Sequence, residues 1–214
     1  MQKIFGVEKY QFYLTDVTTS IIYNNEGCKN KIINSISKDN FTLVDSKMLL
    51  SSILVKDYLR SNGFNMKLIP YYGLNEILQY RFNTLTFEDR IFLKIITSIC
   101  NTSQKVVFDD VLTFLSVKQK CLVLKYLKDN NITFFNFTSD TEEVLYTKYL
   151  IVLSDQGVIV EGNTKSVLME EKVLKHNGFN LPFVVDLSHQ LKDYGLIDKE
   201  YYSIDKLVSD LWKD

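Results

Sequence analysis

Two adjacent carboxylates, Asp109 and Asp110, follow the apolar run from Lys105 to Phe108 and are the residues of this sequence best placed for chemistry. When an acid pair ends a buried strand, the first carboxylate can orient Mg²⁺ with its water shell and the second can polarise an attacking water. Acids also end strands in ordinary turns, where they cap a helix or stabilise the turn. The pair alone leaves both interpretations open.

The segments after the acid pair predict a helix between strands. Apolar residues with helical spacing follow at Val117, Cys121, Leu124 and Leu127. The strongly apolar run 132–137 predicts a buried strand, and the runs 149–153 and 157–160 predict two further strands that form a hairpin. This order is a βαβ unit with a closing hairpin, which indicates an α/β fold.

A second set of candidate residues lies near the start of the chain. Short strands within 3–23 end at Tyr23, a polar turn is predicted over 24–29, and the apolar face of a helix follows. A strand, a turn with glycine and lysine, and then a helix is the layout of a phosphate-binding loop, so Gly27 and Lys29 are candidate phosphate ligands. The competing interpretation is that Lys29 is a loop lysine exposed to solvent, because few glycines accompany it.

Helix start signals mark the middle and the end of the chain. Thr86 is predicted to cap a helix, with Asp89 reciprocating three residues later. Thr164 is predicted to cap a helix that ends at Gly178, Pro182 begins another, and Ser203 begins a last one. The expected apolar faces of three of these helices are Phe87, Ile91, Ile95 and Ile99; Val184, Leu187, Leu191 and Tyr194; and Ile204, Leu207, Val208 and Leu211.

Composition limits the classes of function. A chain of 214 residues that is 46% hydrophobic and 24% charged can bury a sizeable core. The net charge of −1 gives no basic surface for nucleic acid, and the three separated cysteines favour a reducing compartment, with the cytoplasm as the default. No run has the length of a membrane span, so any membrane role is expected to be peripheral. His176 and His189 lack metal-ligand spacing and are interpreted as ordinary surface or cap residues.

The C-terminal region carries the most specific resemblance. The run from Asn177 to Val184, together with Gly195, the run from Tyr202 to Ile204, and Leu207-Val208, resembles the tail of the ATPases of energy-coupling factor (ECF) transporters. The chain as a whole is similar to a degenerate ATP-binding subunit of an ABC transporter. The resemblance implies a reduced P-loop NTPase core of the ABC type over residues 1–164 and a small helical appendage over 165–214. In that family the tail helps two ATPases stay paired.

The resemblance also assigns roles to positions. Lys29 falls on the phosphate-binding lysine of the Walker A loop, and Gly27 is its one surviving, displaced glycine. Asp109 matches the Mg²⁺ aspartate, Asp110 stands in vestigially for the catalytic glutamate, and Ser139 replaces the switch histidine. The signature element corresponds to Leu85, Thr86, Phe87, Glu88 and Asp89.

Departures from the family pattern predict impaired catalysis. Glu26 and Cys28 occupy glycine positions of the phosphate loop, while Phe87 and Glu88 replace both signature glycines. A ring and an acid there should repel a triphosphate. Binding of ATP and Mg²⁺ is therefore in doubt, and the expected function is that of a subunit that has lost hydrolysis. It would pair with an active ATPase and a transmembrane component on the inner face of the cell membrane, for micronutrient uptake. A divergent but active ATPase and an interaction scaffold outside transport remain alternatives.

Overall fold

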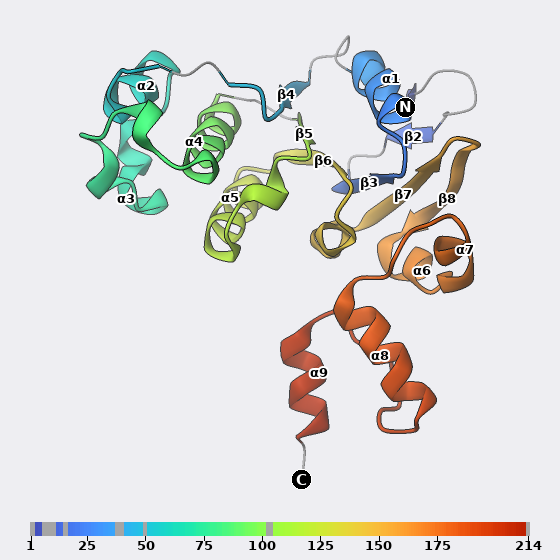
Figure 1. The fold of residues 1–214 in the computed structure, drawn as a ribbon. Coiled ribbons are helices and arrows are strands. Elements are labelled where there is room, and N and C mark those ends of the chain that lie inside the picture. Colours follow the sequence, from blue (N-terminus) through green and yellow to red (C-terminus); the bar gives the residue numbers. More distant parts are fainter. Residues whose placement is uncertain are drawn as a thin grey trace. The chain divides into compact units, whose positions relative to one another are not determined.

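The computed structural model describes residues 3–5, 12–14, 17–36, 41–48, 51–101 and 105–212 (Figure 1). The chain forms two compact units, one of Met1–Ile32 with Thr138–Asp214 and one of Ile33–Phe137. Among the described helices, none is both long and apolar enough to cross a membrane. Strands and helices alternate along the chain, and the predicted α/β class is confirmed.

The strands of the first unit lie in two sheets. β1 (Lys3–Phe5) pairs antiparallel with β2 (Phe12–Leu14). β3 (Thr19–Tyr23), all of whose residues are buried, pairs in parallel with β7 (Tyr149–Ser154), so that Ile21 lies opposite Ile151. β7 then turns back into β8 (Gly157–Asn163) as an antiparallel hairpin. The predicted closing hairpin is confirmed.

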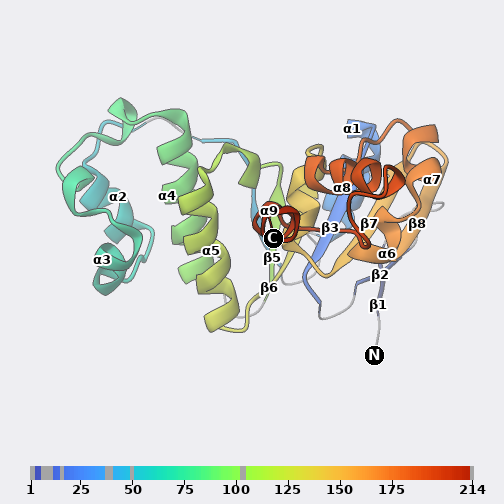
Figure 2. The ribbon, with the colours of Figure 1, turned by 90° about the horizontal axis from the view of Figure 1, so that it is seen from below.

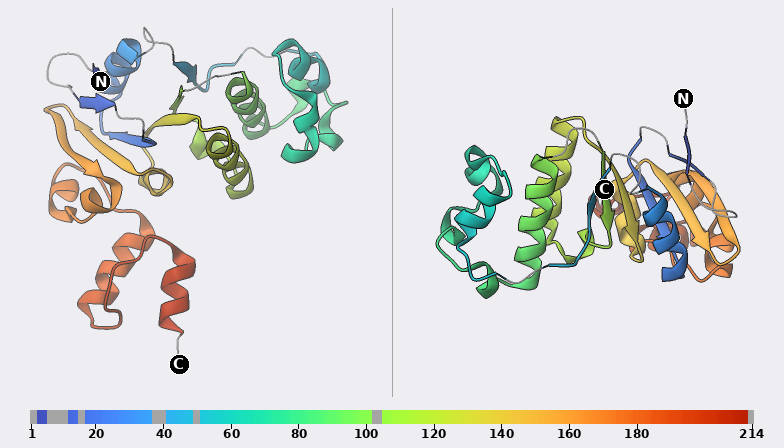
Figure 3. Two further views of the ribbon diagram at one scale, coloured as in Figure 1. Left: turned by 180° about the vertical axis from the view of Figure 1, so that it is seen from behind. Right: turned by 90° about the horizontal axis from the view of Figure 1, so that it is seen from above.

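Helices of the first unit pack on this sheet. The apolar residues Leu150 and Val152 of β7 share one core with side chains from the C-terminal helices, among them Leu174 and Val185. Figure 3 shows α6 and α7 beside the hairpin of β7 and β8. These helical elements are the 3₁₀ helix η5 (Thr141–Tyr146), α6 (Thr164–Leu168), α7 (Glu171–His176), α8 (Phe183–Asp193) and α9 (Ile204–Leu211). The division into a core of 1–164 and a tail of 165–214 stays a prediction.

The predicted helix from Thr164 to Asn177 is wrong in its start and its continuity. The cap is Asn163, whose side chain accepts a hydrogen bond from the Lys165 amide, whereas the Thr164 hydroxyl donates to the carbonyl of Thr147. The helix breaks after Leu168, and α7 begins at Glu171. Gly178 ends α7 with a φ of +81°, as expected for a residue that terminates a helix in the left-handed region.

Two further expectations for the tail are corrected. Tyr194 is 81% exposed instead of lying on the buried stripe of α8, because it is the residue after the last helical turn. The His189 side chain is only 14% exposed, and its Nδ1 lies 3.1 Å from Oε2 of Glu171. His189 therefore joins α8 to α7 and is no ordinary surface residue, while His176 is exposed at the end of α7, as predicted.

The second unit contains the predicted βαβ arrangement. β5 (Lys105–Asp109) lies between β4 (Thr42–Val44) and β6 (Thr133–Thr138), and all three strands are parallel. The crossover from β5 to β6 is α5 (Val117–Asp129), whose capping box pairs Ser116 with Gln119. Figure 2 shows α5 side by side with α4 (Phe87–Cys100).

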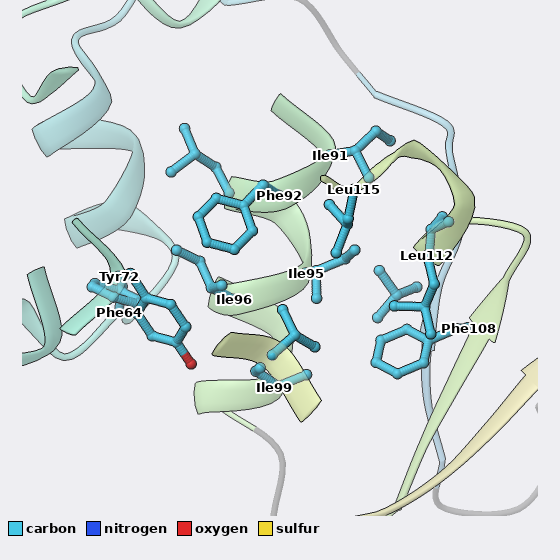
Figure 4. Packing of buried hydrophobic residues seen from close by; sticks show 14 of the residues in the cluster. Phe64, Tyr72, Ile91, Phe92, Ile95, Ile96, Ile99, Phe108, Leu112 and Leu115 are labelled. Carbon is cyan, nitrogen blue, oxygen red and sulfur yellow. The ribbon is translucent and has the colours of Figure 1, made fainter. Parts of the chain in front are cut away.

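The core of the second unit gathers around α4 (Figure 4). Ile91, Ile95 and Ile99 are fully buried, which confirms three residues of the face predicted for this helix, whereas the fourth, Phe87, is 37% exposed because it is the first residue of the helix. The face predicted for α5 is partly wrong, because Val117 and Cys121 are exposed and the helix is buried through Val123 and Leu127. The remaining helical elements are α2 (Val55–Ser61), η1 (Met66–Leu68), α3 (Ile69–Tyr72), η2 (Asn75–Ile77), η3 (Phe82–Thr84) and η4 (Leu112–Phe114).

Candidate functional site

The turn that should resemble a phosphate loop is shorter than predicted. Only Asn24 and Asn25 separate β3 from α1 (Glu26–Ile36), so Gly27 and Lys29 lie in the first turn of the helix. Asn25 causes the early start, since its side-chain Oδ1 accepts from the Gly27 amide at 2.7 Å and its carbonyl accepts from the Cys28 amide at 3.2 Å. A polar side chain that satisfies the free amides of a first turn is a helix cap. The predicted polar turn over 24–29 is corrected accordingly.

Lys29 is buried, with 7% of its surface exposed, so its interpretation as a loop lysine exposed to solvent is wrong. Its Nζ lies 2.7 Å from Oε2 of Glu26, one helical turn earlier. The same ammonium lies over the ring of Tyr23, 5.1 Å from the ring centroid. The hydroxyl of Tyr23 donates to the other carboxylate oxygen of Glu26 at 3.3 Å. Lys29 is thus enclosed by groups of its own turn.

The acid pair lies at the carboxyl end of β5, as the sequence predicts. Asp109 is the last residue of the strand and Asp110 the first beyond it, and both are half-buried. Asp110 has a φ of +52°, a left-handed conformation that aspartate tolerates better than most residues. Its backbone amide donates to the carbonyl of Phe137 on β6 at 2.9 Å, and its carbonyl accepts from the Thr113 hydroxyl at 3.1 Å. Hydrogen bonds to Phe137 and from Thr113 therefore hold the backbone of Asp110 in place.

The residues predicted to form the signature element begin a well-capped helix. Thr86 accepts from the Asp89 amide at 3.1 Å through its hydroxyl oxygen and donates to Oδ2 of Asp89 at 3.0 Å, which confirms the predicted cap. Leu85 is buried, Glu88 is exposed, and the Phe87 ring packs on the Phe114 ring.

Ser139, which is predicted to stand at the switch position, is exposed at the start of the turn that follows β6. The next residue, Asp140, caps η5, because its side chain accepts from the Glu142 amide at 2.9 Å. A hydroxymethyl group ends close to the backbone, so Ser139 lacks the reach of an imidazole. The sequence predicted its place after the strand, and its role at the switch position stays a prediction.

Several residues of this region were missed by sequence reasoning. Asn25, Tyr23 and Phe114 each hold a candidate residue in place: Asn25 the Gly27 amide, Tyr23 the Glu26–Lys29 pair, and Phe114 the Phe87 ring. An asparagine two residues before a glycine is a usable cap signal for Asn25. Tyr23 and Glu26 are only three residues apart, whereas the contact between Phe87 and Phe114 depends on tertiary packing and had no local signal.

The chemistry of the lysine turn fits a nucleotide phosphate poorly. A phosphate loop presents free amides and a free lysine to the ligand. In this chain the amides of Gly27 and Cys28 donate to Asn25, and the carboxylate of Glu26 forms an ion pair with the Lys29 ammonium. Within the described parts of the chain, no three side chains of the His, Cys, Asp and Glu types lie close enough together to hold a metal ion. Asp109 as an Mg²⁺ ligand stays a prediction.

Known structures define the class of the fold. A metal-chelate type ABC transporter in an inward-facing conformation superposes with a TM-score of 0.62 at 17% identity, covering 78% of this chain and 80% of the other. The cbiO1 protein of Clostridium perfringens, part of the ABC transporter complex cbiONQ, superposes with a TM-score of 0.58 at 16% identity, covering 86% and 92%. The chain has the P-loop NTPase fold of an ABC ATPase.

Sequence comparison finds relatives among the ATP-binding proteins of energy-coupling factor transporters. The energy-coupling factor transporter ATP-binding protein EcfA1 of Lactobacillus delbrueckii subsp. bulgaricus is 30% identical over 115 residues, which are 51% of this chain and 41% of that protein. EcfA1 of Caldanaerobacter subterraneus subsp. tengcongensis is 34% identical over 87 residues, 40% of this chain and 31% of that protein. No protein-family model matches the sequence. The chain resembles ECF transporter ATP-binding proteins and spans less than half the length of these relatives.

Proposed function

We propose that this chain is an ATP-binding-type subunit of an ECF-like transporter that has lost hydrolysis. It pairs with an active ABC-type ATPase and couples the ATP cycle of that partner to uptake of a vitamin, metal or other micronutrient. The similarity to ECF ATP-binding proteins and the ABC ATPase fold support the assignment as a subunit of an ECF-like transporter. The observation that carries the loss of hydrolysis is the contact between Phe87 and Phe114, because it holds the Phe87 ring at a position that corresponds, by the resemblance, to a signature glycine.

Pairing through the tail is supported by the surface of α9. Leu207 is buried, whereas Ile204, Val208 and Leu211 expose between 42% and 46% of their surfaces and Trp212 exposes 80%. A helix that presents an apolar stripe to solvent typically buries it against a partner. The occupant we propose is the tail of the second ATPase, which would place the chain at the inner face of the cell membrane beside a transmembrane component. The net charge of −1 gives no support to nucleic acid as a partner.

Co-purification tests this proposal. The tagged chain is co-expressed with a second ABC-type ATPase and a membrane component, and the complex is extracted in detergent. We expect a membrane complex that hydrolyses ATP, while the isolated chain does not. Soluble partners without a membrane component would favour the scaffold alternative.

A divergent but active ATPase is the second candidate. The observation that favours it is the position of Asp109 and Asp110 at the carboxyl end of a parallel strand, held there by the bond from the Asp110 amide to Phe137. ATP hydrolysis by the isolated chain that disappears in Asp110→Asn would establish this candidate and contradict the loss of hydrolysis.

A further inference from the structure

We infer that Glu26 is a built-in anionic ligand of Lys29, which closes the turn between β3 and α1 to phosphate-bearing molecules. The inference deepens the proposed function. It rests on that function only for the expectation that this turn corresponds to a phosphate loop. Oε2 of Glu26 lies 2.7 Å from Nζ of Lys29, the distance of a charge-assisted hydrogen bond. The carboxylate of the chain itself thus binds the ammonium that a phosphate would need.

The exposure of the two side chains shows which one faces solvent. The Lys29 side chain is 8% exposed and the Glu26 side chain 65% exposed. An anion arriving from solution therefore meets Glu26 before it can reach Lys29. It is repelled by the carboxylate, and it must displace that carboxylate to bind the ammonium.

Tyr23 contacts both members of the Glu26–Lys29 pair. Its hydroxyl donates to Oε1 of Glu26 at 3.3 Å, so both oxygens of the carboxylate have a partner. Its ring lies 5.1 Å from Nζ of Lys29, within the range of a cation–π interaction. Tyr23 is itself buried at the end of β3, and its two contacts connect it to both Glu26 and Lys29.

The backbone amides of the turn are closed in the same way. The Oδ1 of Asn25 accepts from the Gly27 amide at 2.7 Å, and the Asn25 carbonyl accepts from the amides of Cys28 and Lys29 at 3.2 Å and 3.4 Å. A Cβ at position 27 would lie 3.0 Å from Oδ1 of Asn25. A side chain at position 27 would therefore crowd the cap formed by Asn25, which favours glycine at this position.

Removal of the Glu26 charge should open the site. Glu26→Gln keeps an oxygen that can accept from Tyr23 but removes the negative charge that lies 2.7 Å from the Lys29 ammonium. With this charge gone, the repulsion of an arriving anion falls and no carboxylate of Glu26 has to be displaced, so the variant should bind an anion from solution more tightly. The probe is inorganic pyrophosphate, measured by calorimetry and by the shift of the melting temperature of the full chain.

We expect wild type to show no binding at millimolar pyrophosphate and Glu26→Gln to bind at least tenfold more tightly. The double variant Glu26→Gln/Lys29→Met should lose that binding. Glu76→Gln, which makes the same change at an exposed glutamate of η2, should behave as wild type. Sodium chloride at the same ionic strength is the salt control. It separates specific binding of pyrophosphate from a general effect of ionic strength.

Tyr23→Phe provides a second route if Glu26→Gln does not fold. It keeps the ring under Lys29 and removes the hydroxyl that holds Glu26, so pyrophosphate binding should rise to an intermediate level. A wild type that binds pyrophosphate as tightly as the variants would overturn the inference, and so would folded variants that do not bind. Neither outcome touches pairing with a second ATPase, which co-purification measures separately.

Discussion

The ring of Phe87 meets the ring of Phe114 edge to face, with centroids 5.0 Å apart and planes at 88°. Phe87 is the first residue of α4 and Phe114 the last residue of η4, so the contact joins the start of one helix to the short helix before α5. Phe87, which is predicted to stand in place of a signature glycine, therefore has an aromatic partner.

This ring pair should show a measurable coupling. In a double-mutant cycle of Phe87→Ala and Phe114→Ala, we expect a coupling free energy of about 0.5 kcal/mol, the lower end for aromatic pairs, because both rings are 37% exposed. Urea unfolding of the four proteins measures it. Strict additivity of the two single effects would mean that the rings do not stabilise one another.

Lys94 should be a strong anchor of the segment after β4. Its Nζ donates to Oδ1 and to the carbonyl of Asp45 and to the carbonyl of Lys47, at 2.5, 2.7 and 2.7 Å. Lys94→Met should lower the free energy of unfolding by about 2 kcal/mol, as hydrogen bonds to charged groups are lost. The control is Arg60→Met, since the Arg60–Asp57 pair is exposed and 4.0 Å long, and it should cost less than about 0.5 kcal/mol. Equal costs for the two variants in denaturant titrations would contradict this ranking.

Asn136 should weaken the fold. It lies on β6, is buried, and neither polar atom of its side-chain amide has a hydrogen-bond partner in the described structure. Asn136→Leu, similar in shape, should raise the free energy of unfolding by about 1 kcal/mol, because burying an unsatisfied amide is costly. Thermal unfolding measures the change, with Asn136→Asp as a control that should destabilise. A less stable leucine variant would indicate that the amide has a partner, such as a buried water.

Acid should remove one contribution to tail stability. Hydrogen bonds from Lys175 and His189 hold the pKa of Glu171 below its ordinary value of 4.5. A carboxyl whose folded pKa is depressed stabilises the fold fully above its unfolded pKa, and this stabilisation is lost as the pH falls through the folded pKa. The difference in unfolding free energy between wild type and Glu171→Gln should therefore be largest near neutral pH and shrink below about pH 4.5. A difference independent of pH would show that charge is not its source.

Substitutions at two neighbouring residues of α9 should affect different properties, stability at one and pairing at the other. Leu207 is 1% exposed, so Leu207→Ala should cost about 2–4 kcal/mol of stability. Val208 is 46% exposed, so Val208→Asp should leave the melting temperature nearly unchanged but weaken pairing with the second ATPase. Calorimetric melting and co-purification measure the two effects. Unchanged pairing in Val208→Asp would remove α9 from the proposed pairing surface.

Local patterns were sufficient to predict much of the fold. β5 and β6, the hairpin of β7 and β8, and the start of α4 at Thr86 are all as expected, because strand hydrophobicity and side-chain caps act over a few residues. The acid pair at the end of β5 belongs to the same group, since its position follows directly from the strand before it.

The tertiary structure decided the environment of each side chain. Sequence spacing could not show that Lys29 is buried against Tyr23 and Glu26, that His189 contacts Glu171, or that Val117 is exposed. Helical periodicity predicts which residues share a face, but burial also depends on which elements cover that face and where the helix ends. The sequence by itself determined the order of strands and helices, the similarity to ECF ATPases and the short spacing of the groups that close the lysine turn, while packing in the tertiary structure determined that Lys29 is buried.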